Sequence, residues 1–77
     1  MTIKELDVVV LTRDVPEHKL RAGDVGAVVH AYAEGKAFEI EFVTGSGHTL
    51  AVETFEPKDI RAVGEGEILH VRSVAAA

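Results

Sequence analysis

Hydrophobic and polar residues alternate with a period of two along most of this 77-residue chain. The clearest stretch is Phe38–Val43, FEIEFV, in which large apolar residues alternate with glutamate. This alternation is typical of a strand that buries one face and exposes the other. The same pattern predicts strands at residues 7–12, 25–33, 36–43, 48–55 and 61–63.

Turn-forming residues separate these segments and predict how the strands are connected. Glu34-Gly35 predicts a two-residue hairpin turn, in which Gly35 takes a positive φ, and Gly45-Ser46-Gly47 predicts a three-residue loop with Gly47 left-handed. Pro57 fixes φ at the start of a single 3₁₀ turn. Residues 13–24 form a long loop, with a helix over residues 16–22 as the alternative.

The number and spacing of these elements predict one small all-β domain. We expect a five-stranded SH3-like barrel over residues 1–63, followed by a glycine joint and a C-terminal strand or tail over residues 64–77. Residues 67–74 still alternate, which predicts a possible sixth strand. Exposing its aliphatic side chains to solvent would favour aggregation. We therefore expect this strand to pair with an edge of its own sheet or with a second copy in a homodimer. The residues concerned are Ile68, Leu69, Val71 and Val74.

Charge and composition narrow the classes of partner. The formal net charge is −5, which opposes binding to a phosphate backbone and favours a basic protein partner. The chain has no cysteine, so no disulfide can form, and it has neither a signal-peptide pattern nor a long apolar run. We therefore expect a cytoplasmic protein.

One segment carries a resemblance to known families. Leu20–Val29, LRAGDVGAVV, is similar to the KOW motif of SH3-like barrels, with Gly23 and Asp24 in the turn and Gly26 where a bent strand crosses its neighbour. The longer pattern over residues 3–63 resembles the small bacterial domain-of-unknown-function 4926 family. The resemblance implies the fold, and it implies no activity, cofactor or site residue.

Catalytic and cofactor motifs are absent from the sequence. We find no P-loop, dinucleotide fingerprint, zinc protease motif or zinc-ligand spacing. The expectation is therefore a protein that is not an enzyme and that uses no cofactor and no dedicated metal site.

The predicted turns place polar residues in a row. They put His30 opposite Glu39 and Glu39 opposite Glu53, with Phe42 facing Leu50 and Ile40 facing Val52 in the core. Two facing carboxylates repel each other unless a cation, a histidine or a basic partner neutralises them. A solvated polar face and a weak metal or small-ligand site are the alternatives to a partner surface.

A non-enzymatic protein-interaction module is the predicted function, of the kind that serves as an antitoxin, an immunity protein or an accessory subunit. An acidic sheet face would dock a basic partner. The alternative is a KOW-like nucleic-acid-binding domain that uses the basic loop residues Arg13, Lys19, Arg21, Lys58 and Arg61. The predicted partner-binding residues are His30, Tyr32, Glu39, Glu41 and Glu53.

Overall fold

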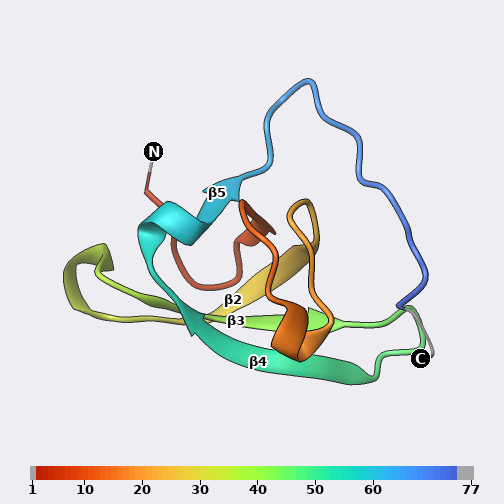
Figure 1. The fold of residues 1–77 in the computed structure, drawn as a ribbon. Helices are drawn as coiled ribbons and strands as arrows, with labels where there is room; N and C mark the ends of the chain where they lie inside the picture. The colour runs from red at the N-terminus through yellow and green to blue at the C-terminus, as the bar shows by residue number, and fades with distance from the viewer. Residues whose placement is uncertain (1, 75–77) are drawn as a thin grey trace.

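A computed structural model describes residues 2–74 and places five antiparallel strands in one sheet (Figure 1). The strand order is β4-β3-β2-β1-β5. The all-β class and the five strands are confirmed, whereas the likeness to SH3-like barrels and to the KOW motif stays a prediction. The strands are β1 (Val8–Leu11), β2 (Val25–Ala31), β3 (Phe38–Val43), β4 (Thr49–Phe55) and β5 (Ile60–Ala62).

Three single-turn 3₁₀ helices lie in the connections. They are η1 (Pro16–His18), η2 (Ala33–Gly35) and η3 (Pro57–Asp59). The turn at Pro57 is confirmed, whereas the long loop contains one turn of 3₁₀ helix in place of the alternative longer helix. Positive φ angles occur at Gly35 and Gly47, as the turn chemistry predicted, and also at the turn residue Gly23. The described residues contain no helix that is long and apolar enough to cross a membrane.

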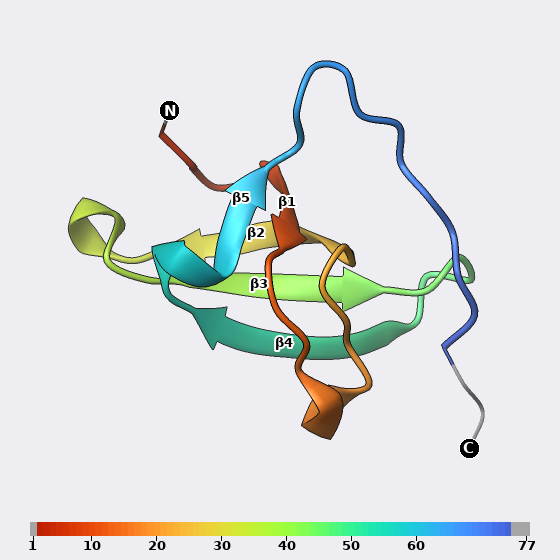
Figure 2. The same ribbon diagram turned by 45° about the horizontal axis from the view of Figure 1, so that its top comes forward.

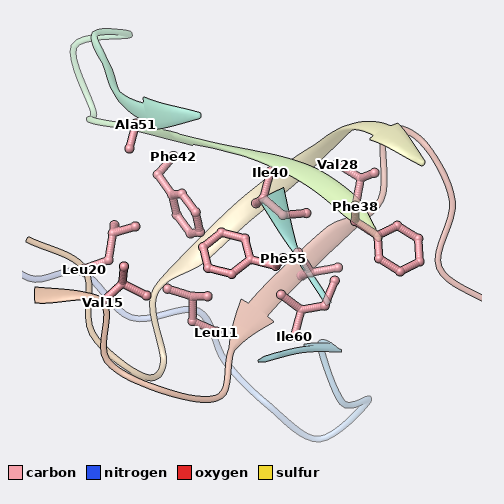
Figure 3. Close-up of a cluster of buried hydrophobic side chains, with 11 residues drawn as sticks. Leu11, Val15, Leu20, Val28, Phe38, Ile40, Phe42, Ala51, Phe55 and Ile60 are labelled. Atoms are coloured by element: carbon pink, nitrogen blue, oxygen red, sulfur yellow. The ribbon is translucent and has the colours of Figure 1, made fainter. Parts of the chain in front are cut away.

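The hydrophobic core lies inside the curled sheet, where side chains from all five strands meet (Figure 3). Phe42 of β3 and Phe55 of β4 pack edge to face, with ring centroids 6.1 Å apart. Two residues of the long loop, Val15 and Leu20, form an isolated bridge and close one end of the core. The other buried members of the cluster are Val9, Leu11, Val28, Phe38, Ile40, Ala51 and Ile60.

Gly26 lets β2 cross closely over β3. A Cβ at this position would lie 2.6 Å from Ile40 Cγ2, 2.8 Å from Phe42 Cε1 and 2.9 Å from the backbone oxygen of Glu41. The absence of a side chain at Gly26 is therefore a packing requirement of the core, as the sequence predicted.

A β-bulge in β2 changes the predicted pairing. His30 pairs with Glu39, as expected, but the register shifts by one residue between Val28 and His30. Val28 consequently pairs with Ile40 and is fully buried. A bulge of this kind inserts one extra residue into the strand. Every residue beyond the bulge therefore points to the face opposite the one that regular alternation would give.

A second bulge, in β4, overturns the predicted pairing of β3 with β4. The hairpin closes as expected, with Val43 opposite Thr49, and then shifts by one residue at Leu50. Without this shift Thr54 would point into the core and Phe55 would face solvent. Burying the phenylalanine, which contributes about 1.5–3 kcal/mol, explains the bulge.

The C-terminal segment of residues 64–74, here called the strap, forms no strand, so the possible sixth strand is wrong for the sheet described here. A turn at Glu65-Gly66 leads the chain away from β5, and Glu67 N–H donates to the Gly64 carbonyl over 3.1 Å. The strap then crosses to the connection between β3 and β4 (Figure 2). Its ion pairs with the rest of the chain are described below.

Candidate functional site

The outer face of the sheet, opposite the core, is the surface that the sequence singled out. One row across four strands runs from Val8 through Ala27 and Glu41 to Val52. The next row runs from His30 through Glu39 to Thr54. Val29, in the bulge, and Tyr32, directly after β2, are also exposed. This outer face therefore mixes half-exposed valines with two carboxylates.

Glu39 and Glu41 alternate along β3 and point to the same side. Within residues 2–74 neither carboxylate forms an ion pair with a lysine or arginine. Glu41 Oε2 accepts a hydrogen bond from Thr49 Oγ1 over 2.7 Å. The outer face therefore carries negative charge that the described part of the domain leaves without a cation.

His30 and Tyr32 lie beside the carboxylates at one end of the outer face. Their rings pack edge to face with centroids 4.5 Å apart. His30 Nδ1 lies 3.5 Å from Glu5 Oε2, so the segment before β1 approaches this end of the sheet. The pair gives the outer face an aromatic border next to Glu39.

The predicted pairing of Glu39 with Glu53 is wrong. Because of the bulge at Leu50, Glu39 faces Thr54, and Glu53 faces Ile40 on the inner side of the sheet. Glu53 Oε2 lies 3.2 Å from His18 Nε2 of η1, at the margin of the core. Glu53 is therefore paired within the domain and does not belong to the outer face.

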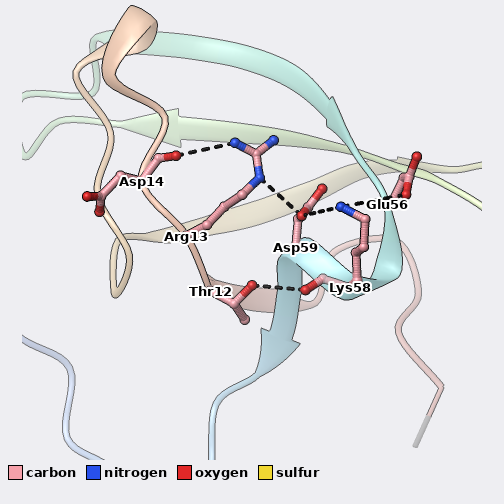
Figure 4. A network of polar contacts seen from close by, with 6 residues as sticks. All are labelled: Thr12, Arg13, Asp14, Glu56, Lys58 and Asp59. Carbon is pink, nitrogen blue, oxygen red and sulfur yellow. Dashed lines mark hydrogen bonds and ion pairs between the residues drawn. The ribbon is translucent and has the colours of Figure 1, made fainter.

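Of the five basic loop residues, Arg13, Lys58 and Arg61 form ion pairs with carboxylates, whereas Lys19 and Arg21 form none within residues 2–74. Arg13 Nε donates to Asp59 Oδ1 over 3.1 Å, and Lys58 Nζ donates to the same oxygen over 3.2 Å (Figure 4). Thr12 Oγ1 donates to the Lys58 carbonyl over 3.0 Å, which ties the end of β1 to η3. These contacts join the long loop to the chain before β5, and Asp59 compensates the positive charges of Arg13 and Lys58.

Asp59 is the buried anchor of this network. Burial alone would raise the pKa of its carboxyl group, but the hydrogen bonds and charges of Lys58 and Arg13 outweigh burial and lower the pKa below its ordinary value. The Asp59 side chain is 8% exposed, whereas those of Arg13 and Lys58 are 51% and 73% exposed, so water reaches the cationic side of each contact. Asp59 therefore stays ionised and holds two cations at the loop junction.

Comparison with known proteins identifies the family to which the domain belongs. Residues 5–62 match the model of a family described as a domain of unknown function (DUF4926). The chain belongs to the DUF4926 family. No curated protein and no solved structure matches the chain. The resemblance to the DUF4926 family is confirmed, and the match ends at the last residue of β5, so the strap lies outside it.

Two arginine–carboxylate pairs hold the strap against the DUF4926 domain. Near β5, Arg61 donates to both oxygens of Glu67 over 2.7 and 2.8 Å. The hydrogen bonds from Arg61, together with one from the Gly64 N–H, lower the pKa of Glu67 to about 2. Glu67 is therefore ionised throughout the physiological range.

The far end of the strap is held by a pair that joins residues 48 positions apart. Arg72 Nε donates to Asp24 Oδ1 over 2.8 Å, and Nη2 donates to Asp24 Oδ2 and to the Lys19 carbonyl. Asp24 also accepts the Arg21 N–H over 2.8 Å. Burial alone would raise the pKa of Asp24, but Arg72 and Arg21 outweigh it and lower the pKa.

The sequence identified Asp24 as a turn residue, and its second role, the pairing with Arg72, was missed. Nothing local in the sequence pointed to that pairing, because the two residues meet only through the path of the strap. The outer-face residues His30, Tyr32, Glu39 and Glu41 lie together as expected. Among the described residues, no group of three histidine, aspartate or glutamate side chains is arranged to hold a metal ion.

Proposed function

We propose that this DUF4926 chain is a non-enzymatic protein-interaction module, whose outer face docks a basic segment of another protein. One observation carries the proposal: Glu39 and Glu41 lie on the same side of β3 without a lysine or arginine partner among the described residues. Half-exposed Val29 and Val52 flank them. A partner that alternates lysine or arginine with aliphatic residues would match both features.

Charge favours a protein over a nucleic acid as the partner. A nucleic-acid surface needs free lysine and arginine side chains that displace the counterions of the phosphates. Of the five basic loop residues, Arg13, Lys58 and Arg61 are each paired with a carboxylate, which leaves Lys19 and Arg21 without an ion pair among the described residues, and the formal net charge is −5. The outer face therefore attracts cations and repels phosphates.

The contribution of the two carboxylates can be isolated with a matched pair of variants. E39Q/E41Q removes both charges and keeps the size of the side chains. E17Q/E65Q removes two exposed carboxylates elsewhere that form no ion pair within residues 2–74, so both variants change the net charge from −5 to −3. A general effect of net charge would appear in both variants, and docking on the outer face would appear only in the first.

A random peptide library displayed on phage and selected on the immobilised domain supplies the probe. We expect the selected peptides to combine lysine or arginine with aliphatic residues. By calorimetry their affinity should fall at least about tenfold, or about 1.4 kcal/mol, for E39Q/E41Q and stay within about twofold for E17Q/E65Q. Peptides that bind E39Q/E41Q as tightly as the unchanged domain would refute the proposal.

A further inference from the structure

The two edge strands of the sheet differ in how much backbone they leave unpaired. The strand order places β4 at one edge and β5 at the other. β5 has three residues, and the carbonyl of its Ala62 accepts a hydrogen bond from the Arg61 side chain over 3.0 Å. β4 has seven residues, and within residues 2–74 its backbone bonds to no backbone other than that of β3. β4 is therefore the long open edge of this sheet (Figure 2).

β4 lacks most of the features by which proteins protect an open edge from a further strand. Its sequence, TLAVETF, contains no proline and no lysine, and its bulge at Leu50 lies near its start. η1 approaches from the inner side, where His18 Nε2 lies 3.2 Å from Glu53 Oε2, and it makes no backbone hydrogen bond to β4. An edge of this kind is a template for an extended peptide that continues the sheet.

The pairing within the sheet identifies the backbone groups that point outward from β4. The N–H and the carbonyl of Val28 both bond to the chain just before β1, so they point away from β3. Bonded and non-bonded pairs alternate along antiparallel strands, so Ile40, opposite Val28, directs its own backbone groups to Glu53 of β4. The neighbours of Glu53, Val52 and Thr54, therefore direct their N–H and carbonyl groups to the open edge.

The side chains beside this edge indicate the chemistry of the occupant. On the outer face, half-exposed Val52 lies between the edge and Glu41, and exposed Thr54 lies between the edge and Glu39. Neighbouring strands are about 4.8 Å apart, so a residue added beside Val52 would lie about 10 Å from the backbone of Glu41. An extended lysine or arginine side chain and the glutamate side chain together span this distance. The aliphatic part of the cationic side chain would then cover Val52.

We propose that the basic segment binds as an added strand along the open edge of β4, with two lysine or arginine residues that reach Glu39 and Glu41. Val52 and Thr54 are two positions apart, so the residues opposite them in the added strand are also two positions apart and point to the outer face. This inference rests on the proposed function and adds the mode of binding. Backbone pairing supplies affinity, and the two carboxylates supply the preference for cations.

Charge disfavours a second copy of this chain as the occupant. β4 contains no lysine or arginine, so pairing two β4 edges would bring no cation to Glu39 and Glu41 of either copy. The added strand is short, and a contact of this size buries less than about 1,200 Å², which is the range of weak and transient complexes. We therefore expect a peptide that binds and dissociates rapidly.

N-methylated versions of the peptides selected on the immobilised domain test this mode of binding. In an added strand, the N–H groups of alternate residues point to β4, and the remaining N–H groups point to solvent. By calorimetry, methyl groups on one alternate set of nitrogens should weaken binding at least about tenfold, and methyl groups on the other set should change it less than about threefold. The second set is the matched control, because it adds the same groups to the same peptide. Equal effects of both sets, or no effect of either, would overturn the inference.

Amide hydrogen exchange followed by NMR locates the contact on the domain. In the free domain, the N–H groups of Val52 and Thr54 should exchange rapidly, and those of Ala51 and Glu53, which point to β3, should exchange slowly. Saturating peptide should slow exchange at Val52 and Thr54 at least about tenfold. Unchanged exchange at both residues would overturn the inference. Slow exchange that depends on domain concentration without peptide would assign the edge to a second copy and would also overturn it.

The inference and the proposed function fail in different ways. Peptides that lose affinity for E39Q/E41Q but tolerate methyl groups on every nitrogen would support the acidic outer face and refute the added strand. Peptides that bind E39Q/E41Q as tightly as the unchanged domain would refute the proposed function, and with it the basic occupant of the edge.

Discussion

Adding one methyl group at Gly26 tests the close crossing of β2 over β3. In Gly26→Ala the new Cβ would meet Ile40 Cγ2 at 2.6 Å, Phe42 Cε1 at 2.8 Å and the Glu41 backbone oxygen at 2.9 Å. All three distances are shorter than any normal carbon contact. The φ angle of Gly26 lies outside the left-handed region, so the penalty is steric and does not come from backbone strain.

The expected cost follows from the atoms that must move. Overpacking a well-packed core costs about 1–3 kcal/mol, and here a backbone oxygen is among the obstructing atoms, so repacking of side chains alone cannot relieve the clash. A chain of this length has a total stability of about 4–12 kcal/mol. With about 4–8 °C per kcal/mol for a domain of this size, the melting temperature should fall by about 5–20 °C. Gly26→Val should cost more.

Thermal unfolding followed by far-UV circular dichroism measures the shift, and Gly45→Ala is the matched control. A Cβ added at Gly45 would meet no atom within 4 Å beyond its chain neighbours, and the φ angle there is ordinary. The replacement should therefore leave stability unchanged or raise it by about 0.4–1 kcal/mol through the unfolded chain. If Gly26→Ala melted within about 2 °C of the unchanged protein, the crossing of β2 over β3 described here would be refuted.

Four further predictions concern the polar contacts. Asp24→Asn should loosen the far end of the strap and lower the free energy of unfolding, measured by chemical denaturation, by about 1–2 kcal/mol. Unchanged order parameters of the Leu69 and Val71 methyl groups would contradict the loosening. Because folding lowers the pKa of Asp24, this residue should contribute fully to the free energy of unfolding at pH values above 3.8, the ordinary pKa. The contribution should disappear as the pH falls below that value. Glu67 should titrate near pH 2 by carboxyl NMR, and a midpoint near its ordinary 4.5 would disprove the Arg61 pair. Asp59→Asn should cost about 1–2 kcal/mol, because Arg13 and Lys58 lose a buried charged acceptor.

Much of the fold follows from local signals in the sequence. The alternation in β3 identifies Phe38, Ile40 and Phe42 as core residues, and all three are buried. The turns at Gly35, Gly47 and Pro57 are equally local, because each depends on the backbone preference of one residue. These signals act over a few residues, so no knowledge of distant contacts is needed to read them.

The two bulges could not be read in the same way. The sequence around Leu50 allows either Thr54 or Phe55 to point inward, and the choice depends on the space beside Phe42 on another strand. A prediction that assumed regular pairing therefore placed Glu53 on the outer face. The error is one residue, yet it reverses the side of the sheet for the rest of β4.

The sequence correctly predicted Glu39 and Glu41 on the outer face, but it could not show which other carboxylates are paired within the folded chain. A net charge of −5 describes the whole chain, but Asp24, Asp59 and Glu67 are occupied by arginine or lysine side chains in the folded domain. Neutralised carboxylates hold the long loop and the strap in place, so they are not available to a partner. Glu39 and Glu41 differ because regular alternation along β3 keeps both on the outer face, where the described part of the chain brings no lysine or arginine into contact with them. The fold thus separates carboxylates that are paired within the chain from Glu39 and Glu41, and under the proposed function exchanging these two for glutamine should weaken the binding of a basic partner without changing the fold.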